Sequence, residues 1–219
     1  MATPYTPLLY HSNYGEGGSD LKALFENLVQ NGLKSCGLVD RTFFGLHEFM
    51  QHCRNYGIKP VIGAQVLLSK EKNIKSYLFV HDEKGYKNLC RIMTAMSFDR
   101  ITIEQIKEHA EGIILLTNSL HVLRTMGLWF SLKYYLLLPG HSVMDDSFPP
   151  LAANEIFYVT KKDKTLYRLM CLIKGNAYEK NVPAQNHLLS NEQFNRVFAD
   201  YPAAIRNNIG LSEMCDYTP

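Results

Sequence analysis

Short apolar runs alternate with amphipathic stretches along almost the whole chain, and this alternation limits the folds open to it. Strands are expected at residues 6–11, 36–40, 61–68, 76–80, 113–117, 134–138 and 151–158. Most of these runs lack polar alternation, which indicates strands buried on both faces, as in a parallel sheet. Repeated strand and helix units leave two architectures, a doubly wound sheet or a barrel, and periodicity alone does not choose between them.

Helices are expected between the strands, because apolar residues there recur with helical spacing. The stretch after residue 18 has this pattern, and Ser19 is its expected N-cap. The stretch after residue 158 has a similar stripe, formed by Leu166, Leu169, Met170 and Ile173. Capping boxes are expected at two helix starts, formed by Thr102 with Gln105 and by Ser190 with Gln193.

Composition bounds the size and class of the protein. With 219 residues and 46% hydrophobic content, a single domain over residues 1–219 is expected, with a loop at residues 139–150. The formal net charge of +2 does not indicate a basic DNA clamp. The five cysteines contain no CxxC pair and suit reduced core thiols rather than zinc. No leader or membrane span is apparent, so we expect a soluble, cytoplasmic protein without a membrane partner.

In either architecture the working surface lies at the carboxyl ends of the strands. The polar residues that follow or end the apolar runs are His11, Ser12, Asp40, Arg41, Gln65, His81, Asp82, Asn118, Ser119, Asn154 and Glu155. A catalytic metal site needs several His, Asp or Glu side chains at one point. Only His11, Asp40 and Glu155 are clear candidates, with His81 a weaker one, and this set is too small for a metal cluster.

Other chemistries have no motif support. The sequence has no GxSxG elbow, no GxxxxGK[ST] phosphate loop and no GxGxxG opening a helix after a strand. Gly15, Gly17 and Gly18 follow the first strand, and their spacing favours a turn over a phosphate cradle. The run from Lys161 to Lys164 is interpreted as a solvated helix start, with a modest DNA or protein contact as the alternative.

Several segments, in a fixed order, carry a family resemblance. They are LLYHSNYGEGGSDLKAL, GLVDRTFFGLHEFMQHCRNYGIKPVIGAQVLL, EKGYKNLCRIM, EGIILLTNSL, NEIFYV and FADYPAAIRNNIGLSEMC. Together they resemble the N-terminal PHP domain (polymerase and histidinol phosphatase) of bacterial DNA polymerase III alpha subunits. The order and coverage make the resemblance more specific than any one string.

The resemblance implies a distorted TIM-like (β/α)7 barrel of the PHP type. It also implies that residues 1–219 are the N-terminal fragment of a longer chain, whose activity would be that of a DNA-directed DNA polymerase, a nucleotidyltransferase. The implied partners are the remainder of the polymerase chain and a proofreading exonuclease subunit, with DNA bound through the parent polymerase. The domain itself is expected to be a non-catalytic scaffold in DNA replication.

Matching the family's metal-binding positions one by one implies a vestigial site. Three positions still hold a residue that can bind a metal: His11 and Asp40 match the family's His and Asp, and Glu155 is found where the family has an Asp. The other positions have changed: Leu9 stands for the first His, Arg41 for a His, Gln65 for a Glu, Lys75 for another His, Ser119 for a Cys and Phe157 for the final His.

Two of these replacements add positive charge. Arg41 or Lys75 inside a metal cavity would repel a cation at close range, so no catalytic residue and no cofactor are expected. An ion pair of Arg41 with Asp40, Glu155 or another acid is the accompanying hypothesis. The alternative is a phosphoesterase or 3'-5' exonuclease that holds Zn, Mn or Mg in a reduced site of His11, Asp40 and Glu155.

Overall fold

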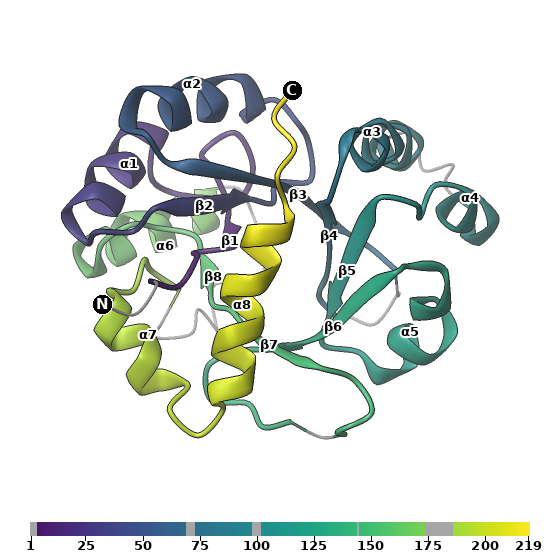
Figure 1. Ribbon diagram of the computed structural model, residues 1–219. Coiled ribbons are helices and arrows are strands. Elements are labelled where there is room, and N and C mark those ends of the chain that lie inside the picture. Colours follow the sequence, from purple (N-terminus) through teal and green to yellow (C-terminus); the bar gives the residue numbers. More distant parts are fainter. Residues whose placement is uncertain (1–3, 69–72, 98–101, 144, 174–185) are drawn as a thin grey trace.

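The computed structural model describes residues 4–68, 73–97, 102–143, 145–173 and 186–219. Its eight described strands form one sheet in the order β7-β6-β5-β4-β3-β2-β1-β8 (Figure 1). Their bounds are β1 Leu9–Tyr10, β2 Ser35–Leu38, β3 Lys59–Val66, β4 Ser76–Val80, β5 Ile113–Thr117, β6 Leu132–Leu137, β7 Pro150–Ala152 and β8 Glu155–Ile156.

The sheet curls into a distorted barrel. β7 and β8 lie at opposite ends of the strand order, yet β7 ends at Ala152 and β8 begins at Glu155. Three peptide units span at most about 11 Å, so the two ends of the sheet must lie close together. The single strand expected at residues 151–158 is therefore wrong, since the chain crosses from one sheet end to the other within it. The fold class, an α/β distorted TIM-like barrel, is confirmed.

One strand runs against the others. β4 pairs antiparallel with both β3 and β5, whereas the remaining neighbours in the sheet are parallel. The expectation of an all-parallel sheet is thus wrong at β4. Because β4 is reversed, its first residues lie at the edge formed by the carboxyl ends of β3 and β5. His81 and Asp82, which follow β4, lie at the opposite edge, where the amide of His81 donates to the carbonyl of Gly112.

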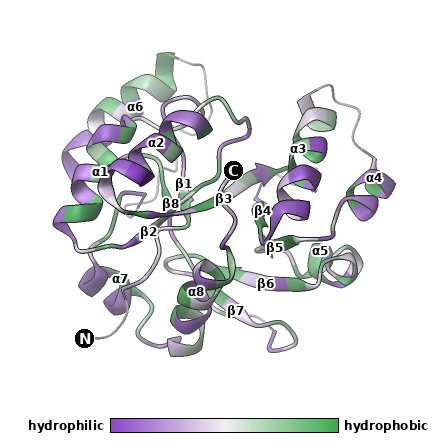
Figure 2. Cartoon of the chain, turned by 45° about the horizontal axis from the view of Figure 1, so that its top comes forward, coloured by the Kyte–Doolittle hydropathy of each residue, from purple (hydrophilic) through white to green (hydrophobic). Residues whose placement is uncertain are grey.

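Helices surround the barrel, and buried apolar side chains lie on both faces of its sheet. The helices are α1 Leu21–Gln30, α2 Leu46–Tyr56, α3 Glu83–Ser97, α4 Ile103–Glu108, α5 Leu120–Thr125, α6 Lys164–Ile173, α7 Asn191–Val197 and α8 Pro202–Met214. They show both hydrophobic and hydrophilic residues (Figure 2). Alternate strand residues face inward, including Tyr77, Ile114 and Leu136, while their neighbours, such as Leu78 and Leu115, join the helix-facing core. The sheet is covered on both faces, as its apolar strands predict.

Local signals placed most helix starts correctly. Both expected capping boxes are present, at Thr102 with Gln105 and at Ser190 with Gln193. The expected cap of α1 is wrong by one residue, because the carboxylate of Asp20 accepts the amide of Ala23 at 2.7 Å. The hydroxyl of Ser19 instead accepts the amide of Val159 at 3.0 Å, and so ties the start of α1 to the chain after β8.

Helix α8 runs at the front of the view from β7 towards β3 (Figure 1). Asn208 on α8 bonds the backbone of Thr6, which precedes β1, and the carbonyl of Ala152 at the end of β7. Lys59, at the start of β3, pairs with Asp216 just beyond α8. This helix therefore connects strands from both ends of the open sheet.

The five cysteines are unpaired thiols, and all except Cys90 are buried, as their sequence positions predict. Among the helices that the structure describes, none has the length and apolar content needed to cross a bilayer.

Candidate functional site at the strand ends

Polar side chains from five strands meet at the carboxyl-end edge of the barrel. His11 follows β1, Asp40 lies two residues beyond β2, and Gln65 is near the end of β3. Glu155 opens β8, and Lys75 immediately precedes the reversed β4. Because β4 runs backwards, its start brings Lys75 to the same edge as the strand ends. Lys75 pairs with Glu155, and the charges of Glu155, Lys75 and Arg41 all influence the pKa of His11.

Glu155 forms an ion pair with a lysine of the same chain. Its carboxylate is buried, with 4% of the residue exposed, and its Oε2 atom pairs with the ammonium of Lys75. The other oxygen, Oε1, accepts the hydroxyl of Tyr77 at 2.6 Å. Both oxygens of the carboxylate are therefore engaged by donors of the protein itself, and a buried carboxylate with a hydrogen-bonded cation is in a satisfied state.

His11 is buried at the centre of the site. Its ring stacks on Phe157 with centroids 4.4 Å apart, and within the described residues its Nε2 atom has no hydrogen-bond partner. Burial lowers the pKa of His11 to about 4, while Glu155 raises it and Lys75 and Arg41 lower it further. The imidazole is therefore neutral near pH 7, with one nitrogen directed at no described polar group.

The carboxylate of Asp40 is hydrogen-bonded to the loop that follows β1. Its Oδ1 atom accepts the amide of Ser12 at 2.9 Å and its Oδ2 atom accepts the Ser12 hydroxyl at 2.5 Å. Burial raises the pKa of Asp40 to about 6, although both bonds from Ser12 lower it and the charge of Glu16 raises it. Gly15 leaves room for this carboxylate, since a Cβ atom there would lie 2.6 Å from Oδ1. Asp40 thus fixes the loop after β1.

Arg41 lies at the rim of the site, where its side chain is 41% exposed. Its Nε atom donates to Oε1 of Gln65 at 3.1 Å, and its Nη1 atom pairs with Glu16 at 3.5 Å. The ion pair of Arg41 is therefore with Glu16, and the described contacts do not join it to Asp40 or Glu155. Gln65, which stands where the resemblance places a Glu, acts here as an acceptor for a guanidinium.

The remaining positions of the expected vestigial site have structural contacts. Leu9 is fully buried in the inner core of the barrel. Ser119 caps α5 by accepting the amide of Val122 at 3.3 Å. Phe157 lies between two rings, since it stacks on His11 and also contacts Tyr167 of α6 with centroids 5.5 Å apart. Leu9 and Phe157 have no ligand atom for a divalent ion, and the hydroxyl of Ser119 is engaged in the cap of α5.

The donor set does not fit a divalent metal. In the part of the chain that the structure describes, no three His, Cys, Asp or Glu side chains lie close enough together to hold a metal ion. The carboxylate oxygens of Asp40 and Glu155 are also engaged, by Ser12 and by Lys75 and Tyr77 respectively. A metal at this edge would also meet the ammonium of Lys75 at close range.

The glycine loop after β1 forms a turn. The amides of Gly15 and Gly17 both donate to the carbonyl of Ser12 at 2.9 Å, and the amide of Gly18 donates to the carbonyl of Phe157 at 2.6 Å. Amides that already bond backbone carbonyls do not form a phosphate cradle. The interpretation of these glycines as a turn is therefore confirmed.

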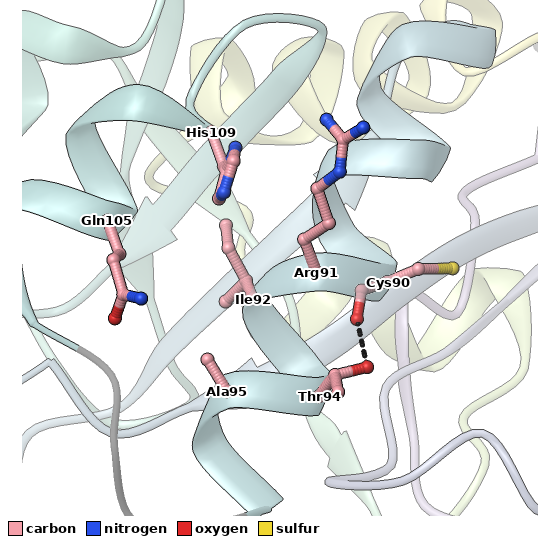
Figure 3. A pocket seen from close by; sticks show the side chains of 7 residues that line it. All are labelled: Cys90, Arg91, Ile92, Thr94, Ala95, Gln105 and His109. Carbon is pink, nitrogen blue, oxygen red and sulfur yellow. Dashed lines mark hydrogen bonds between the residues drawn. The ribbon is translucent and has the colours of Figure 1, made fainter.

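A separate pocket of about 410 Å³ lies between α3 and α4 (Figure 3). It is lined by Cys90, Arg91, Ile92, Thr94, Ala95, Gln105 and His109. The hydroxyl of Thr94 bonds the carbonyl of Cys90, and burial raises the pKa of the Cys90 thiol, so this thiol is a poor nucleophile at neutral pH. No residue of the strand-end site takes part in this pocket.

Two important residues of the site were missed from the sequence. Tyr77 binds Glu155, and Glu16 binds Arg41. Tyr77 lies two residues after Lys75, so both point to the same face of an extended segment, and this period-2 spacing was an available signal. Glu16 belongs to an irregular loop, where no sequence period indicates which way a side chain points.

Fold and site together define an α/β barrel with a group of polar side chains at its strand ends. In this group the acid Glu155 is paired with Lys75 of the same chain. A family model described as the PHP domain matches residues 8–146. The chain belongs to the PHP domain family.

Curated relatives place the similarity more narrowly. DNA polymerase III subunit alpha of Borreliella burgdorferi is 24% identical and covers 94% of this chain. The proteins of the same name from Helicobacter pylori (strain 26695) and Vibrio cholerae are 24% and 25% identical and cover 96% and 100% of it. The resemblance to the PHP domain of these subunits is therefore confirmed. The chain spans about a quarter of the length of these relatives, 23% in each case.

Among solved structures, similarity is found to a two-domain protein from Bacteroides vulgatus that contains a predicted PHP-like metal-dependent phosphoesterase. That protein is 13% identical, and the match covers 80% of this chain and 50% of the other, with a TM-score of 0.41.

Proposed function

We propose that this PHP domain is a non-catalytic scaffold and docking module of a bacterial DNA polymerase III alpha subunit. In this role it would stabilise the remainder of the polymerase chain and dock a proofreading exonuclease subunit, and DNA would be bound by the parent polymerase. Replication in the cytoplasm is the corresponding setting. The similarity to alpha subunits over nearly the whole chain supports this proposal.

The Lys75–Glu155 pair carries the non-catalytic part of the proposal. Hydrolysis by metal-dependent enzymes requires acidic and imidazole ligands whose lone pairs are free for the ion. Here Glu155 is neutralised by an ammonium group of the same chain, and Asp40 is held by Ser12. A metal ion would have to displace Lys75 and compete with Tyr77 before it could reach Glu155.

A second candidate is a phosphoesterase or 3'-5' exonuclease with a reduced metal site. One observation favours it: the Nε2 atom of His11 is buried and has no partner among the described residues. Neutral imidazole nitrogen is a good ligand for Zn. His11 alone supplies only one ligand, however, and a catalytic ion typically takes three from the protein.

Metal content and hydrolysis distinguish the two functions. The purified chain is analysed for Zn, Mn and Mg by elemental analysis, then incubated with Mn²⁺ or Zn²⁺ and either a phosphomonoester or a 3'-labelled primer-template. We expect less than one metal ion per ten chains and turnover equal to a blank. Stoichiometric metal, together with hydrolysis that disappears in Asp40→Asn or His11→Gln, would establish the enzyme and end the scaffold proposal.

The docking part is tested separately with the full-length alpha subunit that contains this sequence. Deleting the domain should reduce the soluble yield of the polymerase and its co-purification with the exonuclease subunit. A truncated polymerase that stays soluble and retains the exonuclease would show that the domain has neither role.

A further inference from the structure

The outward face of α6 is apolar and uncovered by any described residue of the chain. Leu166, Leu169, Leu172 and Ile173 are 55%, 52%, 50% and 77% exposed. The helix is held from its other side, where Tyr167 and Cys171 are buried and Tyr167 contacts Phe157 of the strand-end site. In Figures 1 and 2, α6 lies at the outside of the molecule on the same side as α1 and α2.

This face has the spacing that helices use to dock. Leu166, Leu169 and Ile173 occupy positions i, i+3 and i+7, which form a continuous ridge along one side of a helix. In α1 the residues with this spacing are buried against the core. In α6 the ridge points away from the core, so packing within the described chain does not account for it. Contiguous exposed apolar surface of this kind marks interaction sites.

Positive charge gathers at one end of the ridge. Lys161 and Lys162 lie in the short 3-10 helix before α6, Lys164 begins α6, and Arg168 follows one turn later. Ion pairs among the described residues involve none of these four cations. Asp163, which directly precedes α6, is engaged by the amide and hydroxyl of Thr160.

Lysines outnumber acids at the start of α6, where Asp163 is the residue directly before the helix. The N-terminal end of a helix favours negative side chains because of its dipole, yet the first turn of α6 contains no acidic residue. Lys161, Lys162 and Lys164 place three positive charges at this end of the helix. An anionic group from outside the chain would neutralise these lysines, which no described ion pair engages.

We infer that the outward face of α6 binds an amphipathic helix of a partner protein, whose apolar side covers the ridge and whose acidic residues meet Lys161 and Lys162. This inference names the surface and partner chemistry for the docking role in the proposed function and rests on it. A second copy of the chain would bring the same cations, and like charges disfavour that pairing. Nucleic acid would be bound by the lysines but would leave the leucine ridge uncovered.

The test uses a labelled helical peptide of about 20 residues, with leucines at helical spacing and glutamates flanking them, and a twin with lysines in place of the glutamates. Fluorescence anisotropy with the 219-residue chain should give an affinity for the acidic peptide at least about tenfold higher than for its basic twin. Hydrogen exchange should show protection confined to residues 161–173.

Surface variants separate the ridge from general hydrophobicity. Leu169→Ser with Ile173→Ser, or Lys161→Glu with Lys162→Glu, should each weaken binding about tenfold or more. Leu128→Ser is the matched control, because Leu128 is 77% exposed outside α6, and it should bind like the parent. Circular dichroism melting verifies that each variant is folded. Folding is expected to be preserved because the substituted side chains are exposed.

The inference is overturned if the two peptides bind equally, if Leu128→Ser weakens binding as much as the ridge variants, or if neither peptide binds. It is also overturned if sedimentation shows a dimer that the ridge variants dissociate, or if DNA or anionic vesicles bind the ridge in preference to the acidic peptide. A metal-loaded, hydrolytic chain that still bound the acidic peptide would contradict the proposed function alone. A metal-free, inactive chain that ignored the peptide would contradict this inference alone.

Discussion

The ammonium group of Lys75 pairs with the Oε2 atom of Glu155 and thereby connects the start of β4 to β8 across the strand-end site. The pair depends on the reversal of β4, which brings the beginning of that strand to the edge where the other strands end. Tyr77, from the same strand, holds the second oxygen of Glu155. An acid in a position suited to a metal ligand is therefore neutralised by the protein's own cation.

Removing this cation should destabilise the fold. In Lys75→Met the carboxylate of Glu155 would remain buried with Tyr77 as its only remaining described donor, and an unpaired buried charge is costly. Because the Lys75 side chain is 24% exposed, we expect a loss of about 2 kcal/mol in the free energy of unfolding, less than for a fully buried pair. Urea titration followed by circular dichroism measures this loss.

The double variant Lys75→Met with Glu155→Gln should recover most of that stability, since the remaining amide is neutral and still accepts from Tyr77. Lys87→Met provides the matched control: its exposed pair with Glu83 lies on the surface of α3, and its removal should leave the urea midpoint unchanged. If Lys75→Met were as stable as the parent, the pair would not hold β4 to β8.

Asp40 and His11 should affect the pH dependence of stability in opposite directions. Burial raises the pKa of folded Asp40 from 3.8 to about 6, so between these values the folded chain holds a proton that the unfolded chain has lost. Its contribution is complete at low pH and is lost as pH rises through 6. Burial lowers the pKa of folded His11 from 6.5 to about 4, so its contribution is complete above 6.5 and is lost as pH falls through 4.

In the parent chain these two contributions to the free energy of unfolding are opposite in sign and similar in size, each about 3 kcal/mol at most. They should therefore largely cancel between about pH 4 and 6. Asp40→Asn should leave the His11 effect alone, so stability should rise from pH 4 to 6.5. His11→Gln should leave the Asp40 effect alone, so stability should fall over the same range. Urea midpoints of the two variants measured across this range would run in parallel if burial did not shift these groups.

Local sequence signals predicted much of the fold. Residues 76–80 and 113–117 are strands with the expected bounds, and both capping boxes form, because these features depend on residues close in sequence. Strand direction depends on contacts far along the chain, so apolar content alone did not reveal the reversal of β4. The split between β7 and β8 was missed for the same reason, since an apolar run does not indicate where the chain changes neighbours.

The candidate site was predicted in outline and not in its contacts. Strand ends and the family resemblance named Lys75, Glu155, Arg41 and Gln65 as residues of the site. Which of them pair depends on distances across the barrel, so Arg41 joins Glu16 instead of a central acid. The apolar stripe of α6 shows a related limit, because helical periodicity identifies an apolar face but not what covers it.

The loop after β1 should tolerate no side chain at Gly17. A Cβ atom there would lie 1.9 Å from the carbonyl oxygen of His11, so the backbone would have to move beside the strand-end site. Gly17→Ala should therefore lower the free energy of unfolding by about 3 kcal/mol, as overpacking against backbone does. Differential scanning calorimetry provides the measurement.

Gly210→Ala is the control for this substitution. Gly210 lies within α8, where a Cβ atom would meet nothing within 4 Å, and alanine in a helix interior is more favourable than glycine by about 0.5–1 kcal/mol. This variant should melt at a higher temperature than the parent. Equal melting temperatures for the two variants would mean that the loop after β1 adapts freely.

Asn208 should be the residue on which the attachment of α8 depends most. Its Oδ1 atom accepts the amide of Thr6 at 2.8 Å, and its Nδ2 atom donates to the carbonyls of Thr6 at 2.9 Å and Ala152 at 3.0 Å. Asn208→Ala would leave these backbone groups buried without partners, so we expect a loss of about 3 kcal/mol in the free energy of unfolding.

Hydrogen exchange would locate that loss, because amides of α8 and β7 should exchange faster in Asn208→Ala while those of α1 and α2 keep their protection relative to global unfolding. Asn195→Ala is the matched control, since Asn195 is exposed on α7 and Asn191, four residues earlier, is its partner among the described residues. If both variants were equally stable, the two ends of the sheet would be held together by apolar packing of α8 alone, through residues such as Leu211 in the inner core.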